Sequence, residues 1–172
     1  MPQKTAELDE ALTRAAEAGF TARLVEDWSV AVDAAMVARL ATRDLKSLLV
    51  RTRIRTAVLT RLEILQPHKL AARQAAVFLA LPVHGALALR LLSRTADTMW
   101  QAAGDTSTDF NWYTKRAILG TVYVATEIAW FGDDTPDGCK TTAFLDARIA
   151  NVMDYEKLKA RVRTACEGWT PS

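Results

Sequence analysis

The sequence is poor in histidine and cysteine, and both shortages exclude classes of site. Two histidines, His68 and His84, are too few for a zinc site or for the paired Glu-x-x-His motifs of a di-iron bundle. We expect both to be partly exposed loop residues. Two cysteines, Cys139 and Cys166, lie far apart and form no CxxC motif, which predicts reduced thiols and no disulfide framework.

Catalytic signatures are missing as well. The sequence has no G-x-S-x-G, no H-E-x-x-H, no glycine-rich phosphate loop and no kinase or Rossmann motif. With so little histidine, it offers almost no general base. We therefore predict no catalytic residues, no metal site, no cofactor and no enzymatic activity.

Long apolar runs are absent too. The longest, AAVFLALPV at residues 75–83, is too short to span a bilayer and contains Pro82. The amino-terminal MPQKTAELDEALTRAAEAGF lacks the apolar centre of a secretory signal, and its four acidic residues argue against a mitochondrial transit peptide. A soluble or peripheral protein is expected.

Helix-forming residues dominate what is present. The chain has 172 residues, half of them hydrophobic, which suits one domain with a real core. Seven glycines and five prolines are few, while Ala, Leu, Arg and Glu are abundant. No strand-like alternation appears, so the sequence predicts an all-α fold of seven or eight helices.

Apolar spacing, caps and prolines set the expected helix boundaries. A break is predicted near Asp27, with Ser29 capping a new start, and a loop is predicted over residues 132–140. Two of the helices, 84–102 and 107–131, are apolar on more than one face, as central helices are. The expected helices cover residues 5–18, 21–40, 43–65, 68–81, 84–102, 107–131 and 141–165.

The charges are unevenly distributed along the chain. Residues 1–35 carry three basic and seven acidic side chains, whereas residues 36–74 carry nine basic and two acidic ones. Within the basic stretch 43–56, Arg51 and Arg55 share a helix face, but no aromatics are interleaved for base stacking. A solvated helix face is the preferred interpretation, and attraction to anionic lipid headgroups is the second. No nucleic-acid partner is predicted.

The stretch GDTSTDFNWYTKRA, residues 104–117, is much more polar and aromatic than the rest. Thr106 and Asp109 match a capping box, and Asp105 also suits the positive end of a helix dipole. Helix capping therefore explains the carboxylates and hydroxyls.

Capping does not explain the aromatic residues of this stretch. Phe110, Trp112 and Tyr113 lie in the first turns of the helix, and neighbouring residues point in different directions, so at least one should face outward. An exposed Trp or Tyr beside Met99 is typical of an interface hot spot. These residues predict a docking surface.

The same stretch carries a family resemblance. DTMWQAAGDTSTDFNWYTKRAIL, residues 97–119, resembles the ubiquinone-biosynthesis accessory proteins of the Coq-nine family. Supporting pieces are LALP at 79–82, AFLDARIANVMDYEKLK at 143–159 and RIRTAVLTRLEIL at 53–65. The likeness covers about residues 36–160.

The resemblance implies an all-α, TetR-like helical bundle, used as a homodimer for lipid binding without DNA. It implies a bound isoprenoid lipid or quinone and a partner, the di-iron hydroxylase that acts on demethoxyubiquinone. The partner-docking patch of the family maps onto Met99, Asp109, Trp112 and Tyr113. We expect Trp112 and Tyr113 to face outward beside the lipid pocket.

The pocket walls are expected on the helices that flank the motif. For each residue, ordinary core packing is the competing interpretation. The candidate lipid-binding residues are Leu81, Leu91, Leu92, Thr95, Ile118, Val122 and Thr126.

Both ends depart from the family pattern. Residues 1–40 are predicted to be a degenerate helix-turn-helix segment, 41–165 the lipid-binding bundle and 166–172 a tail. The first segment is acidic and short for a DNA-binding domain. The terminal EKLKARVRTACEGWTPS predicts only weak contact with a membrane surface or phospholipid.

Two further expectations complete the functional hypothesis. A TetR-type, ligand-responsive transcriptional regulator is the alternative function. The lack of a recognisable transit peptide and the bacterial character of residues 53–65 predict a cytoplasmic protein, peripheral to a bacterial inner membrane.

Overall fold

The computed structural model describes residues 19–105 and 110–152, and within them it contains helices and no strand. This confirms the predicted all-α fold. The elements are α2 (Ala22–Leu40), α3 (Val50–Leu65), the 3₁₀ turn η1 (Gln66–His68), α4 (Lys69–Leu79), the 3₁₀ turn η2 (Pro82–His84), α5 (Gly85–Ala102) and α6 (Phe110–Phe131). A further helix covers residues 139–152. The helices expected at 5–18 and beyond residue 152 lie outside the described residues.

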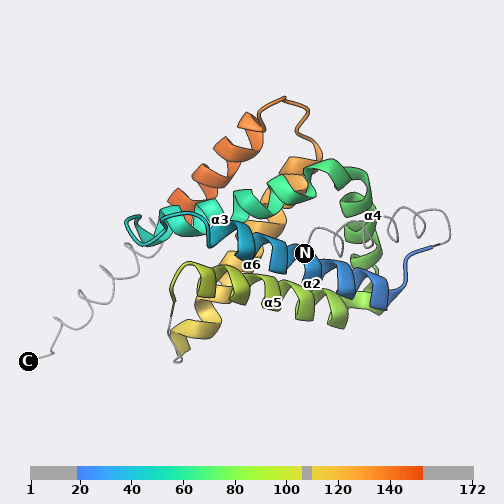
Figure 1. The fold of residues 1–172 in the computed structure, drawn as a ribbon. Coiled ribbons are helices and arrows are strands. Elements are labelled where there is room, and N and C mark those ends of the chain that lie inside the picture. Colours follow the sequence, from blue (N-terminus) through green and yellow to red (C-terminus); the bar gives the residue numbers. More distant parts are fainter. Residues whose placement is uncertain (1–18, 106–109, 153–172) are drawn as a thin grey trace, which may run out of the picture.

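Four helices form the bundle around one core. Helix α2 packs on α3 and α5, and α6 packs on α5 and α3, while α4 crosses one end of the bundle and contacts α5 (Figure 1). Met36 from α2, Val58 from α3 and Leu145 from the 139–152 helix are among the fully buried side chains. Residues 22–40, which we had assigned to a separate amino-terminal segment, thus contribute to the same core. The domain division itself stays a prediction.

Helix α2 is continuous, so the break predicted near Asp27 and the cap at Ser29 are wrong. The helix begins instead at Thr21, whose hydroxyl accepts a hydrogen bond from the Leu24 amide at 3.3 Å. Trp28 and Val32 are buried in the core, and their packing outweighs the weak helix propensity of Asp and Ser. The sequence pattern of this segment did not show that packing.

Helix α3 begins at Val50, seven residues later than predicted. Residues 43–49 form turns, and Arg53 fixes them by donating hydrogen bonds to the Lys46 and Leu48 carbonyls at 2.9 and 2.8 Å. Arg53 also donates to the Ala103 carbonyl at 3.1 Å. Arg53 thereby ties the turns of residues 43–49 to the carboxyl end of α5. The sequence had predicted a continuous helix over these seven residues.

The carboxyl end of α5 is closed by Gly104, as predicted. Its φ of +85° lies in the left-handed region, and two hydrogen bonds complete a Schellman cap. The Gly104 amide donates to the Gln101 carbonyl at 2.9 Å, and the Asp105 amide donates to the Trp100 carbonyl at 3.0 Å. The turn directs the Asp105 carboxylate toward α6.

Candidate functional site

A cavity of about 700 Å³ opens between α2, α3, α4, α5 and α6. This volume falls in the range of about 300–1,000 Å³ that is usual for small-molecule sites. Its walls are mainly aliphatic and aromatic. Its lining includes Val25, Trp28, Val32, Leu65, Ala72, Ala75, Leu79, Leu91, Leu92 and Phe131.

The rim and the floor of the cavity differ in exposure and in polarity. Val77, Leu89 and Ile128 line the cavity and are 63%, 68% and 64% exposed, so they form an apolar rim. At the floor, Arg61 and Tyr123 also line the cavity but are buried. An amphipathic molecule entering here meets apolar side chains first and polar side chains last.

The floor is built on a buried ion pair between α3 and α2. The Arg61 Nε donates to Oδ1 of Asp33 at 2.9 Å, and both side chains are almost fully buried. Thr95 of α5 donates its hydroxyl to the same carboxylate, at 3.0 Å to Oδ2. Three helices are thereby joined through one carboxylate.

Helix α6 adds Tyr123 and Glu127, one turn apart, to this floor cluster, which comprises Asp33, Arg61, Thr95, Tyr123 and Glu127. Arg61 donates a hydrogen bond to the Tyr123 hydroxyl. Tyr123 in turn donates to Oε1 of Glu127 at 2.5 Å. The same Oε1 lies 3.9 Å from the guanidinium of Arg61. The cluster holds two carboxylates and one guanidinium.

Burial shifts the protonation equilibria of the floor cluster. Desolvation raises the pKa of Glu127, while Arg61 and the Tyr123 hydrogen bond oppose it. Desolvation also raises the pKa of the Tyr123 phenol well above its ordinary value, so it remains a neutral donor. For Arg61, burial lowers the pKa, but Tyr123, Asp33 and Glu127 raise it more, and the guanidinium stays charged.

The structure places three of the seven predicted lipid-binding residues in the cavity: Leu91, Leu92 and Thr95. The other four do not line it. Thr126 is fully buried, and its hydroxyl donates a hydrogen bond to the Val122 carbonyl at 2.7 Å. Val122 is buried in the core. Leu81 is 48% exposed in the turn after α4, and Ile118 is half-buried outside the lining.

Sequence reasoning missed the polar floor entirely. Tyr123 and Glu127 occupy positions i and i+4 within an apolar helix, a spacing that places both on one face. That pattern was a readable signal of a polar site on α6. Their partner Arg61 is 62 residues away from Tyr123 in the chain, and nothing in the local sequence connects the two.

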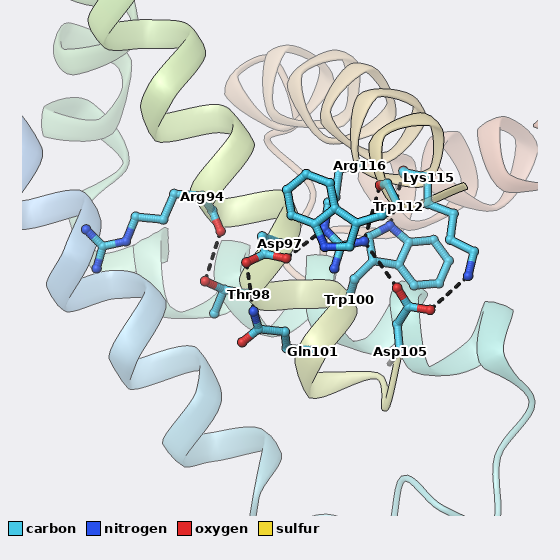
Figure 2. A network of polar contacts seen from close by, with 9 residues as sticks. All are labelled: Arg94, Asp97, Thr98, Trp100, Gln101, Asp105, Trp112, Lys115 and Arg116. Carbon is cyan, nitrogen blue, oxygen red and sulfur yellow. Dashed lines mark hydrogen bonds and ion pairs between the residues drawn. The ribbon is translucent and has the colours of Figure 1, made fainter. Parts of the chain in front are cut away.

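A second polar network joins α5 to the start of α6 (Figure 2). We call it the α5–α6 clamp, formed by Asp97, Asp105, Lys115 and Arg116. Arg116 donates from Nε to Asp97 at 2.6 Å and from one terminal nitrogen to Asp105 at 3.1 Å. Lys115 donates to the other oxygen of Asp105 at 2.8 Å. Among the described residues of this network, two acidic and two basic side chains therefore balance.

One tryptophan ring lies over each cation of this clamp. The Arg116 guanidinium carbon lies 4.1 Å from the centre of the Trp112 ring, and Lys115 Nζ lies 5.4 Å from that of Trp100. The indole of Trp100 also donates to the Lys115 carbonyl at 3.1 Å, as Figure 2 shows. Asp105, which we had assigned to the helix dipole, also pairs with both of these cations.

The predicted docking residues have different environments. Tyr113 is 69% exposed, and its ring meets the edge of the half-buried Trp112 with 4.7 Å between the ring centres. One aromatic residue thus faces outward, as the sequence indicated. Met99 is fully buried and cannot contact a partner directly, because it packs in the core. Asp109 and the Thr106 cap lie outside the described residues.

The patch and the cavity are separate along α6. Trp112 and Tyr113 are at the amino-terminal end of α6, whereas Val124 and Ile128 at the cavity are in its second half. With a rise of about 1.5 Å per residue, Tyr113 and Val124 lie roughly 16 Å apart along the axis. On α5, however, Thr95 of the cavity lies two residues from Asp97, which pairs with the Arg116 that Trp112 covers, so the expectation that patch and pocket lie side by side stays a prediction.

The described residues contain no group of three or more His, Cys, Asp or Glu arranged to hold a metal ion. His68 and His84 lie in η1 and η2 rather than in open loops, and His84 stacks on Phe78 with 3.9 Å between ring centres. Cys139 is a free, exposed thiol. These three side chains form no common site.

No single helix of the described chain is both long and apolar enough to cross a membrane. Two segments, Val50–Leu79 and Pro82–Ala102, meet that test of length and composition only as a pair bent by 91°.

Comparison with known proteins connects this structure to one family. The family model described as COQ9 matches residues 85–156. The ubiquinone biosynthesis protein COQ9 of Rattus norvegicus is 41% identical over 114 residues, which are 66% of this chain and 36% of the rat protein. The Homo sapiens protein is 40% identical over 114 residues, which are 66% of this chain and 36% of the human protein. The Drosophila melanogaster protein is 34% identical over 102 residues, which are 59% of this chain and 31% of the fly protein. The chain thus spans about a third of the length of these relatives.

The relatives also correct one expectation. They are named as mitochondrial proteins, and they come from eukaryotes. The predicted location in a bacterial cytoplasm, peripheral to the inner membrane, is therefore wrong. The recognised motif at residues 97–119 falls within the matched region, and the chain belongs to the COQ9 family.

Proposed function

We propose that this chain is an accessory protein of ubiquinone biosynthesis that carries a lipid and does not convert it. In this proposal, the cavity between the helices holds an isoprenoid quinone intermediate. The exposed surface around Tyr113 docks on the demethoxyubiquinone hydroxylase, and the protein presents its lipid to that enzyme. The homodimer and the weak membrane contact implied by the family belong to the same proposal.

The observation that supports lipid carriage best is the cavity with its apolar rim. Moving an isoprenoid tail into water costs about 0.8 kcal/mol for each CH₂ group, so free diffusion to an enzyme is strongly disfavoured. A cavity lined by residues such as Trp28, Leu91 and Leu92 replaces the bilayer interior with a similar environment. Transfer between the two then costs little.

The separation of patch and cavity along α6 supports a division of tasks. A partner bound at Tyr113 leaves the rim at Leu89 and Ile128 open. The α5–α6 clamp fixes the amino-terminal part of α6 against α5, which holds the docking surface rigid. Lipid exchange can then occur at the other end of the same helix while the partner stays bound.

The test is a reconstituted reaction of the full chain with demethoxyubiquinone hydroxylase and liposomes containing demethoxyubiquinone. We expect the chain to increase hydroxylase turnover and to bind the enzyme in a pull-down. Tyr113→Ala should abolish both effects and retain the fold, because the side chain is exposed. Leu70→Ala, an equally exposed change on α4, is the matched control and should retain both.

Two results would contradict the proposal. One is a hydroxylase that turns over at the same rate with and without the chain. The other is a Tyr113→Ala variant that binds and stimulates as the wild type does, which would remove the docking role from this surface. Hydroxylation of the quinone by the isolated chain would show that it is an enzyme in its own right.

A further inference from the structure

We infer that the floor of the cavity is a head-group site that accepts a neutral, hydroxyl-bearing head and rejects a carboxylate or a phosphate, with Glu127 as the selecting residue. This inference rests on the proposed function only in that the cavity takes a lipid. It adds the orientation and the chemical class of the ligand. The ligand is a long-chain alcohol or phenol, a class that includes the hydroquinone form of the proposed quinone, and it enters head first.

The hydroxyl donors of the floor are already used within the cluster, together with Nε and one terminal nitrogen of Arg61. Arg61 donates to Asp33 and Tyr123. The Thr95 hydroxyl donates to Asp33, and the Tyr123 hydroxyl donates to Glu127. A ligand that brings only acceptors therefore finds no free hydroxyl donor at the floor and can bond only to the remaining N–H groups of Arg61.

Glu127 is the acceptor that is open to a ligand. Its Oε1 accepts from Tyr123, while among the described residues no donor reaches its Oε2. Its side chain is 19% exposed and lines the cavity, whereas Asp33 is 3% exposed and lies behind Arg61. A hydroxyl on the ligand would supply the donor that this oxygen lacks.

The charge of the floor cluster excludes an anionic head. When Glu127 is ionised, Asp33 and Glu127 together exceed the single guanidinium of Arg61 by one negative charge. A carboxylate or phosphate placed here would lose its hydration and face that excess charge in a poorly solvated site. The basic Arg73 is on the cavity wall but exposed to solvent, so it does not neutralise the floor.

The shape of the cavity fixes the orientation. Polar atoms at the buried floor and apolar atoms at Val77, Leu89 and Ile128 on the rim match an amphipathic molecule with its head inside. The tail then passes out through the rim. During hand-over the tail has to leave first, and the head last.

The experiment compares ligands that share a tail and differ in the head. We would measure binding of 1-decanol, its methyl ether and decanoate to the full chain at pH 8 by calorimetry. A hydroxyl donating to a charged acceptor predicts the alcohol to bind at least about tenfold more tightly than decanoate. The ether, which accepts but cannot donate, should fall between the two.

Glu127→Gln tests the selecting residue, because it removes the charge and retains the shape. We expect the gap between alcohol and decanoate to shrink at least about threefold, mainly through tighter binding of decanoate. Glu63→Gln, an exposed glutamate of α3 that pairs with Arg43, is the matched control and should leave the gap unchanged. The wild-type comparison does not depend on the folding of any variant.

The possible failures can be told apart. Equal binding of alcohol and decanoate to the wild type, or an unchanged gap in Glu127→Gln, would overturn the head-group site and leave the lipid carrier intact. If none of the three ligands binds and demethoxyubiquinone does not bind either, both the inference and the proposed function are overturned.

Discussion

Two buried arginines organise two parts of this molecule in opposite ways. Arg61 is 8% exposed and lies in the floor cluster, where two carboxylates exceed one cation and the site opens into a cavity. Arg116 is 6% exposed and lies in the α5–α6 clamp, where the cations and carboxylates of the described residues are equal in number. Because buried charges are costly unless paired, the balanced cluster supports structure, and the unbalanced one is suited to a ligand.

The largest expected effect is on the clamp. Arg116→Ala leaves Asp97 and the nearly buried Asp105 without their shared cation. Breaking a buried pair typically costs about 3–5 kcal/mol, and we expect a loss of that order in the free energy of unfolding, measured with urea. Arg90→Ala breaks only an exposed pair with Glu26 and should cost about 0–1 kcal/mol. Equal losses in the two variants would show that the clamp is not structural.

A smaller effect is expected at the turn that supplies the clamp with Asp105. Gly104→Ala places a Cβ at a φ of +85° and 3.3 Å from the Arg53 guanidinium. We expect a loss of about 1–2 kcal/mol in the free energy of unfolding. Gly85→Ala, which has an ordinary φ and open space around it, should be neutral or slightly stabilising. A Gly104→Ala variant as stable as Gly85→Ala would contradict the role of this turn.

The floor cluster should respond to pH in a way that Glu127→Gln removes. The folded-state pKa of Glu127 is raised, chiefly by desolvation, so the native state binds this proton more tightly than the unfolded chain does. The neutral Glu127 carboxyl therefore contributes stability below the pKa of the unfolded chain. This stability is lost as the pH rises through the raised pKa of the folded state. At pH 7 the glutamine variant should be more stable than the wild type, and the difference should vanish at about pH 4.

Urea unfolding of both proteins across that range provides the measurement. A difference that stays constant with pH would show that Glu127 is not destabilised by burial. The Glu63→Gln control should follow the wild type throughout, since Glu63 is exposed.

The smallest effect on stability is expected at the docking surface. Tyr113→Ala removes a ring that is 69% exposed, and surface substitutions usually change the free energy of unfolding by less than about 0.5 kcal/mol. A loss well above that value would mean that the ring contributes to folding through Trp112. Loss of hydroxylase binding with intact stability would separate docking from structure.

The sequence predicted what depends on local signals. Pro82 and Gly104 mark helix ends, the apolar spacing located α5 and α6, and the family motif identified the relatives. The break at Asp27 was predicted from propensity alone, and the packing of Trp28 overrode it. The predicted start of α3 at residue 43 was wrong because Arg53 binds three carbonyls that only the fold brings together.

The site was less predictable than the fold for the same reason. Leu91, Leu92 and Thr95 were found from their helix, but the floor cluster depends on contacts among α2, α3, α5 and α6. Helical spacing also cannot distinguish residues that face a cavity from residues that face the core. Thr126 lies one turn after Val122, on the core side of α6, and was assigned to the pocket.

The most direct test of the central claim is mass spectrometry of the organic extract from the natively purified full chain. Ala88→Phe fills the cavity from its lining, and Ala86→Phe places the same side chain on the exposed side of α5 as a control. The account predicts a polyprenyl quinone or its demethoxy precursor, near one per chain or per dimer, in the wild type and in Ala86→Phe but not in Ala88→Phe. A folded wild type that yields no isoprenoid lipid, or an Ala88→Phe variant that retains it, would contradict the claim that this cavity carries the lipid.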